Sequence, residues 1–124
     1  TVSVTFDTFY DNAANSLDGV SCSGILTTGT GFTDIGSLSD QNIGGAGVVE
    51  FFDDPQGCAT CWNLTFQAST GPISVPIFVI DSSAEGTFNI AMKAMDTLTD
   101  GQAEQLGRVS ASAEQIPVSD CGMR

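Results

Sequence analysis

The chain contains no histidine, and only Lys93, Arg108 and Arg124 stand against its 15 aspartates and glutamates. Without histidine, neither a Ser-His-Asp triad nor a Cys-His pair can form, which excludes the common nucleophilic hydrolase sites. The net charge of −12 disfavours nucleic acid and anionic membranes, because affinity for both depends on lysine and arginine. A neutral polymer such as a polysaccharide meets no such electrostatic penalty.

Long apolar runs are also missing. No stretch of about 18 apolar residues occurs, so the sequence predicts no membrane-spanning helix. The glycine-rich stretches fit neither a P-loop nor a dinucleotide-binding pattern, and no cofactor is predicted. The 124 residues predict one domain over residues 1–124, and 14 glycines favour strands joined by turns over a helical bundle.

Four cysteines are present: Cys22, Cys58, Cys61 and Cys121. A zinc site needs two CxxC pairs or added histidines, and this chain has one CxxC and no histidine, so no metal site is predicted. A thioredoxin-type site places its CxxC before a helix, whereas the residues after Cys61 have the pattern of a strand. The cysteines therefore indicate two structural disulfides and an oxidising, extracellular location. Four cysteines allow three pairings, and spacing does not choose among them.

Alternating apolar and polar residues predict strands at 2–6, 62–68 and 109–113, and a largely apolar run predicts a central strand at 73–80. Thr70-Gly-Pro72 is typical of a hairpin turn. Asn42-Ile-Gly-Gly45 is interpreted as a turn that leads into a strand at Gly47–Phe52, and 26–38 as short irregular strands. Together these segments predict a mainly β protein, a small barrel with minor α content.

Helical spacing appears once, where Ala91, Ala94, Met95 and Leu98 fall at i, i+3, i+4 and i+7. Asn89 is the candidate N-cap of this helix, and Thr99-Asp-Gly101 is expected to end it. Thr99 and Gln102 then have the spacing of a capping box for a short second helix that Gly107 ends.

Carboxylates are the only side chains of a catalytic type in good supply. Asp81 follows the most apolar strand, where the backbone would hold it at a barrel rim. Its alternative role is a turn-forming aspartate before Ser82. Tyr10 and Asp11 follow the first strand, and an aromatic beside hydrogen-bonding groups suits a sugar, although a tyrosine at a strand end can equally be structural. Glycoside cleavage would need a second acid facing Asp81, for which Asp11 and Glu50 are the candidates.

Two further residues have a structural interpretation and a functional one. Trp62 directly follows a cysteine, which favours packing in the core against a disulfide. Asn63-Leu-Thr65 is the single N-glycosylation sequon of the chain and lies inside a predicted strand.

In order along the chain, these segments resemble the cerato-platanin family of small secreted fungal proteins, over residues 2–122. The blocks that carry the resemblance are Val4-Thr-Phe-Asp-Thr-Phe-Tyr-Asp-Asn12, Gly31-Phe-Thr-Asp-Ile-Gly-Ser-Leu38, Asn42-Ile-Gly-Gly45, Cys58-Ala-Thr-Cys-Trp62 with Leu64-Thr65, Ile80-Asp81, Phe88-Asn-Ile-Ala91, Ala94-Met95 and Gly101-Gln-Ala-Glu-Gln-Leu-Gly-Arg-Val109.

The resemblance implies a six-stranded double-ψ β-barrel related to expansins, with disulfides Cys22–Cys58 and Cys61–Cys121. It implies a secreted, extracellular or cell-wall protein that binds chitin-type N-acetylglucosamine oligomers without hydrolysing them. It further implies a phytotoxin or elicitor of plant defence, with a plant surface receptor as a possible partner. The family's expansin-like acid corresponds to Asp81, its Tyr-Asp pair to Tyr10 and Asp11, and two further matching blocks contain Asn42 and Thr60.

The chain departs from the family pattern in two loops. Phe51-Phe-Asp-Asp54 stands where many members have Gly-Trp-Asn-Ser, and Ser82–Thr87 replaces a His-Ala or Thr-Ala stretch. The leading hypothesis is a non-catalytic binder of N-acetylglucosamine polymers with no catalytic residues and a shallow groove around Asp81. The alternatives are a cellulose-loosening protein or weak glycosidase, and an elicitor recognised through its surface loops.

Overall fold

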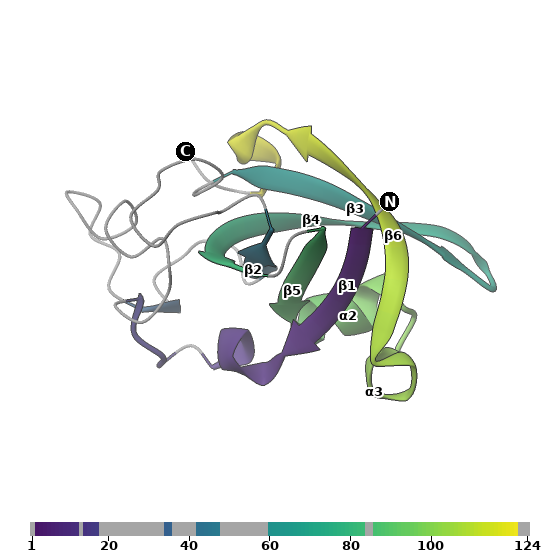
Figure 1. Cartoon of the computed structure of the whole chain (residues 1–124), viewed down its shortest axis with the longest axis horizontal. Coiled ribbons are helices and arrows are strands. Elements are labelled where there is room, and N and C mark those ends of the chain that lie inside the picture. The colour runs from purple at the N-terminus through teal and green to yellow at the C-terminus, as the bar shows by residue number, and fades with distance from the viewer. Residues whose placement is uncertain are drawn as a thin grey trace.

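The computed structural model describes residues 2–12, 14–17, 34–35, 42–47, 60–83 and 86–121. Six strands close into a barrel in the order β1-β5-β2-β4-β3-β6, with two short helices beside it (Figure 1). The predicted six-stranded, mainly β fold with minor α content is confirmed. The elements are β1 (Val2–Asp7), η1 (Thr8–Asp11), β2 (Ile43–Ala46), β3 (Cys61–Ala68), β4 (Gly71–Ser82), β5 (Thr87–Ala91), α2 (Met92–Leu98), α3 (Ala103–Leu106), β6 (Arg108–Ile116) and η4 (Val118–Cys121).

The barrel combines antiparallel and parallel pairs. β3 pairs antiparallel with β4 and β6, while β1 runs parallel to β5 and β2 runs parallel to β4. A simple succession of hairpins would contain no parallel pair, since parallel strands need longer crossover connections. Strands from distant parts of the chain therefore lie side by side.

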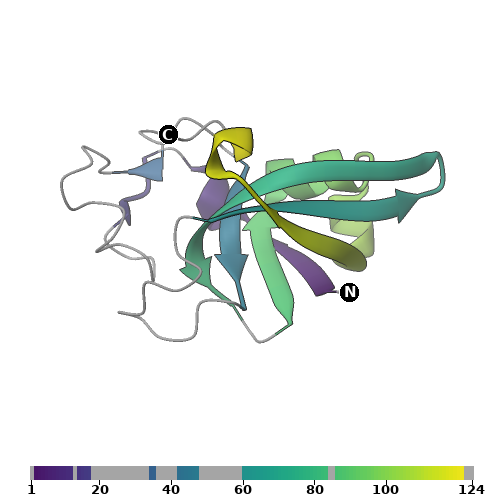
Figure 2. The same cartoon turned by 90° about the horizontal axis from the view of Figure 1, so that it is seen from above.

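The longest strand pair is the predicted hairpin of β3 and β4. Its register runs from Cys61 opposite Phe78 to Ala68 opposite Gly71, and the turn lies at Ser69 and Thr70. β4 has β2 on one side and β3 on the other, so the central position expected for the apolar strand is confirmed. In both views the tip of this hairpin projects beyond β6 (Figures 1 and 2).

The structure corrects the prediction for residues 42–45. Ile43–Ala46 is strand β2 rather than a turn, and all four residues are buried. A Cβ on Gly44 would lie 2.5 Å from the carbonyl oxygen of Asn89 and 2.7 Å from the Cα of Ile90. Glycine is therefore required here for close approach to β5, not for a turn. The strand expected at 47–52 lies outside the described residues, apart from Gly47. The same holds for Glu50, for the loop at 51–54, and for the irregular strands expected at 26–38, apart from residues 34–35.

The helix begins one residue later than its apolar pattern indicates, and Asn89 does not cap it. Asn89 lies in β5, where its side-chain oxygen accepts a 2.9 Å hydrogen bond from the hydroxyl of Thr5. The N-cap of α2 is Ala91, which makes no side-chain capping bond. The predicted end is confirmed, with Asp100 and Gly101 at φ values of 59° and 83°.

The second helix, α3, is present, but the predicted capping box is wrong, because the N-cap of α3 is Gln102 and it makes no side-chain capping bond. The Thr99 hydroxyl accepts a hydrogen bond from the backbone N–H of Gln102 at 3.2 Å. Gly107, at a φ of 67°, ends α3. Glycine adopts this left-handed conformation without the steric cost of a Cβ.

One of the two implied disulfides lies within the described residues. Cys61 in β3 is bonded to Cys121 in η4, with their Cα atoms 6.0 Å apart. The bond joins the C-terminal segment to the barrel wall, and both cysteines are buried. Cys22 and Cys58 lie outside the described residues.

The barrel interior is filled by aliphatic side chains, as the alternation of apolar residues predicts. The largest side chains with almost no exposed surface are Leu17, Ile35, Ile43, Leu64, Ile77, Ile80, Ile90, Met95 and Leu98.

The half-buried Trp62 packs edge-on against Phe88 with ring centroids 6.0 Å apart, and its indole N–H donates to the Thr60 hydroxyl.

None of the helices described is long and apolar enough to cross a membrane.

Candidate functional site

Asp81 lies near the end of β4, where the apolar strand meets the barrel rim. The four residues before it, Ile77–Ile80, are buried, whereas Asp81 itself is half-buried. It is in register with Gly45 of β2, directly after a bulge between Gly44 and Gly45. Bulges often redirect a side chain at a barrel rim, so local backbone geometry helps to set the position of Asp81.

Tyr10 and Asp81 are brought together directly. The Tyr10 hydroxyl donates a hydrogen bond to Asp81 Oδ2 at 3.0 Å, across 71 positions of sequence. The tyrosine side chain is only 3% exposed. Burial, followed by the charge and hydrogen bond of Asp81 and the charge of Asp7, raises the pKa of the Tyr10 hydroxyl well above its ordinary value. The Tyr10 hydroxyl is therefore a protonated donor to the carboxylate of Asp81 well into the alkaline range.

The exposed aromatic surface beside this pair belongs to Phe9. Its side chain is 37% exposed, and its ring packs edge-on against Tyr10 with centroids 5.6 Å apart. The Phe9 backbone N–H donates to Asp7 Oδ1, and its carbonyl accepts from the Asn15 side chain. Phe9 was not among the predicted site residues. The usable signal was its place next to Tyr10 in the segment that follows the first strand.

Asp11 caps a helix in this structure, and its contact with a sugar stays a prediction. Its Oδ2 accepts the backbone N–H of Met92 at 2.7 Å, and its Oδ1 accepts that of Lys93 at 2.9 Å. These N–H groups lie in the first turn of α2, where no acceptor within the helix is available. A carboxylate at this position also interacts favourably with the helix dipole. Asp11 thus supplies the cap that Asn89 does not.

Asn42 and Thr60 flank β4 on opposite sides, just before Asp81. The carbonyl of Asn42 accepts the N–H of Phe78 at 3.0 Å, and that of Thr60 accepts the N–H of Val79 at 2.9 Å. These backbone bonds place both residues two to three positions upstream of Asp81 along the strand. Of the five predicted site residues, Tyr10 and Asp81 are therefore in direct contact, while Asn42 and Thr60 are neighbours through the sheet.

A shallow hollow of about 530 Å³ lies on the α2 side of η1, between Thr8, Asp11, Met92, Lys93, Asp96 and Thr97. Its wall contains acidic groups and a lysine. Among the residues that the structure describes, no group of three or more histidines, cysteines, aspartates or glutamates could hold a metal ion.

The fold and the Tyr10–Asp81 contact define a small, closed six-stranded barrel with a fixed carboxylate at its rim. Comparison with known protein families identifies the family, because the model of the Cerato-platanin family matches residues 2–123. The chain belongs to the cerato-platanin family.

Individual relatives agree with this placement. The chain is 37% identical to the heat-stable 19 kDa antigen of Coccidioides immitis over 129 residues, covering 100% of this chain and 83% of that protein. It is 40% identical to the allergen Asp f 15 of Aspergillus fumigatus over 122 residues, covering 97% of this chain and 76% of that one.

Solved structures show the same barrel. Cerato-platanin 1 from M. perniciosa superposes with a TM-score of 0.89 at 34% identity, covering 98% of this chain and 99% of that chain. The solution structure of the fungal elicitor cerato-platanin gives a TM-score of 0.73 at 30% identity, covering 97% of this chain and 96% of that chain.

Proposed function

We propose that this protein is a secreted, non-catalytic carbohydrate-binding protein that binds chitin-type N-acetylglucosamine oligomers on the surface around Asp81. The observation that carries the proposal is the Tyr10–Asp81 hydrogen bond beside the exposed ring of Phe9. A fixed carboxylate accepts hydrogen bonds from sugar hydroxyl or amide groups, and an exposed aromatic face can stack against a sugar ring. A neutral ligand is compatible with the net charge of −12.

Each aromatic residue has a separate role in this proposal. Tyr10 is buried and cannot offer its ring face to a ligand, so it acts by holding Asp81. Phe9 offers its exposed ring to the sugar. The next residue, Tyr10, holds Asp81, and Asp11 after it caps α2. Asn42 and Thr60 add polar groups on the two sides of β4.

The use of Asp11 supports the non-catalytic part of the proposal. Glycoside hydrolysis needs one protonated and one ionised carboxyl group facing the same bond. Both oxygens of Asp11 accept hydrogen bonds from backbone N–H groups of α2, so Asp11 is engaged as a helix cap and does not face Asp81 as a second acid. Release of reducing ends from chitin or cellulose by the pure protein between about pH 4 and 7 would contradict this part of the proposal.

Sedimentation with insoluble chitin tests the binding itself. The wild-type protein is expected to pellet with chitin, and Asp81→Asn to remain mostly in solution. Asp120→Asn removes the same charge from exposed η4 and serves as the matched control, which is expected to pellet like the wild type. Failure of the wild-type protein to pellet would refute the proposal.

We also infer that the protein acts as an elicitor or phytotoxin towards plants. Support comes from the family relative whose solution structure is described as that of a fungal elicitor. Infiltration of leaves with wild-type protein and Asp81→Asn separates two routes. Necrosis lost with Asp81→Asn would tie elicitation to sugar binding, whereas necrosis that persists would indicate a plant surface receptor that recognises other loops.

A further inference from the structure

Strands β3 and β6 of the closed barrel pair over only part of their length. The ladder between β3 and β6 runs from Cys61 opposite Ile116 to Thr65 opposite Ser112 and ends there. Beyond that point, residues 108–111 of β6 pair with β1, and residues 66–68 of β3 pair with β4 in the hairpin that projects past β6. The two strands therefore diverge instead of continuing their ladder.

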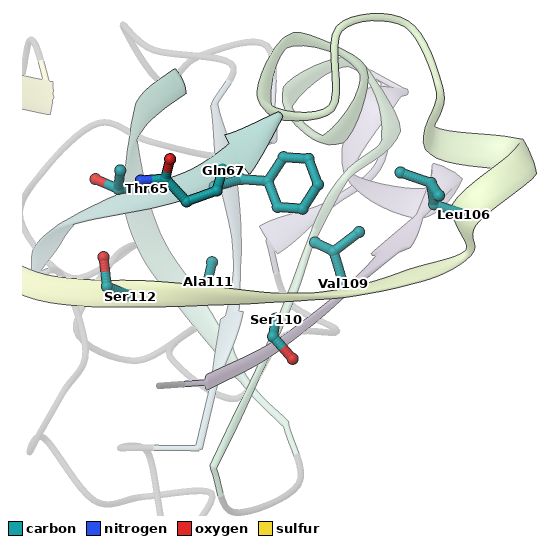
Figure 3. A pocket seen from close by; sticks show the side chains of 8 residues that line it. Thr65, Gln67, Leu106, Val109, Ser110, Ala111 and Ser112 are labelled. Carbon is teal, nitrogen blue, oxygen red and sulfur yellow. The ribbon is translucent and has the colours of Figure 1, made fainter. Parts of the chain in front are cut away.

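A cleft of about 510 Å³ lies at this divergence, and we name it the seam cleft (Figure 3). The side chains of Val109 and Ala111 project from β6 into the gap, with Leu106 at one end. The eight residues that line the seam cleft are Thr65, Phe66, Gln67, Leu106, Val109, Ser110, Ala111 and Ser112.

The seam cleft joins an apolar floor to a polar rim. Val109 and Ala111 belong to the barrel interior, with 8% and 4% of their surface exposed. Leu106, by contrast, is 41% exposed and is one of three large apolar side chains that stand out on the described surface. The rim carries hydroxyl groups from β3 and β6 and the exposed amide of Gln67.

The seam cleft differs from the hollow beside α2 in having no charged lining residue. None of its eight lining residues is charged, although the chain carries 15 acids. The hollow beside α2 is of similar size and contains Asp11, Asp96 and Lys93. A charge on the ligand would therefore find no partner in the seam cleft. Affinity would come from apolar contact and from hydrogen bonds to the hydroxyl groups.

We propose that the seam cleft is a second binding site, which takes a neutral oligosaccharide with one apolar sugar face on Leu106 and Phe66 and its hydroxyls on the serine and glutamine rim. Its volume lies within the roughly 300–1,000 Å³ of small-molecule sites, which are mostly apolar with a few placed polar groups. Sugar rings have this same division into an apolar face and a hydroxyl edge.

An extended peptide fits the seam cleft less well. Peptides that add to a sheet obtain their affinity from a run of main-chain hydrogen bonds along a free edge. The free stretch of β3 covers only residues 66–68 before the turn at Ser69, which is shorter than the five or six residues of a typical strand. The polar side chains of the rim, rather than the backbone edge, supply most of the hydrogen-bonding groups.

The seam cleft is separate from the surface around Asp81. Thr65 is paired with Ser74 of β4, seven positions before Asp81, which corresponds to about 23 Å along the strand. The two proposals are therefore independent of each other. A chain with two such sites would bind a polysaccharide more tightly than an oligosaccharide that fills only one, because the second contact becomes intramolecular.

The test is an amide-shift titration by NMR with chitotetraose, cellotetraose and xylotetraose as separate probes. We expect one or more probes to shift the amides of Thr65–Gln67 and Val109–Ser112. Leu106→Ala is expected to weaken this binding about three- to tenfold, from the lost apolar contact. Val118→Ala removes a similarly exposed apolar side chain from η4 and is expected to bind like the wild type. Asp81→Asn is expected to leave the seam shifts unchanged.

Shifts confined to the surroundings of Tyr10 and Asp81 would overturn the second site while supporting the first. Equal weakening by Leu106→Ala and Val118→Ala would also overturn it, since the effect would then not belong to the seam cleft. A peptide of alternating valine and threonine provides the contrasting probe. Seam shifts with this peptide and none with the three sugars would refute an oligosaccharide site.

Discussion

The Tyr10 hydroxyl donates a 3.0 Å hydrogen bond to Asp81 Oδ2 and so joins η1, which follows the first strand, to the end of β4. The tyrosine is buried and the aspartate is half-buried. A hydrogen bond to an ionised acceptor in a partly dehydrated site is stronger than one in water. The carboxylate is thereby fixed in one orientation before any ligand arrives.

The raised pKa of Tyr10 predicts how the protein responds to alkali. Tyr10 is the only tyrosine, so near-ultraviolet absorbance reports its ionisation without overlap from others. In the folded protein we expect no tyrosinate at about pH 11, whereas the unfolded chain ionises near pH 10. Because the folded pKa is the higher one, this contribution to stability is complete below about pH 10 and decreases as pH rises above it.

Tyr10→Phe is the control for the alkaline response. In this variant the free energy of unfolding should no longer decrease above about pH 10 through ionisation of Tyr10. At neutral pH the free energy of unfolding should be about 1–2 kcal/mol lower, because the hydrogen bond to Asp81 is lost. A wild-type protein that forms tyrosinate near pH 10 while still folded would show that the tyrosine is not held as described.

Removal of the distant helix cap should destabilise the protein. Asp11→Ala leaves the N–H groups of Met92 and Lys93 without their acceptor, and we expect a loss of about 1–2 kcal/mol in the free energy of unfolding. Urea denaturation measures this loss. Asp120→Ala removes an equal charge from an exposed position and should change stability by less than about 0.5 kcal/mol. Equal effects of the two substitutions would mean that Asp11 acts only through net charge.

The contact between β2 and β5 leaves no room for a side chain at position 44. Gly44→Ala would place a Cβ within 2.7 Å of the backbone of both Asn89 and Ile90, so we expect destabilisation of about 2–3 kcal/mol or failure to fold. Gly107→Ala meets no atom within 4 Å and carries only the cost of a positive φ, about 1 kcal/mol. Denaturant midpoints of the two variants should fall in that order, and the reverse order would contradict the described strand pairing.

The Cys61–Cys121 bond closes a loop of sequence separation 60. The chain-entropy relation gives at most about 4 kcal/mol for a loop of this length. The double variant Cys61→Ala, Cys121→Ala should lose up to that amount, as measured by denaturation under oxidising conditions. Peptide mapping without reduction should recover the two cysteines in one linked fragment. A Cys58–Cys61 link in that map would refute the observed pairing.

Much of the barrel could be predicted from sequence because its signals are local. Strict alternation marks β1, β3 and β6, and the apolar run with its Thr70-Gly-Pro72 turn marks the long hairpin. The strand β2 gave no such signal, because two glycines weaken strand propensity, and their value appears only when β5 approaches closely.

The helix cap was mispredicted because it depends on contacts between residues far apart in the sequence. Asn89 stands where a helix cap is expected, yet its oxygen is used by Thr5, 84 positions away. Asp11 caps the same helix from 81 positions away, a role that no local pattern indicates. Tyr10 and Asp81 were predicted separately, from two motifs, and their contact appears only when the barrel closes.

The most direct test of the Asp81 site is an NMR titration of the full chain with chitohexaose. We expect the largest amide shifts at Phe9, Tyr10 and Asp81, and an affinity at least about tenfold lower in Asp81→Asn, as for a lost charged hydrogen bond. Asp120→Asn should bind like the wild type. Undiminished binding by Asp81→Asn, or shifts that avoid these three residues, would contradict a sugar site built on the Tyr10–Asp81 hydrogen bond.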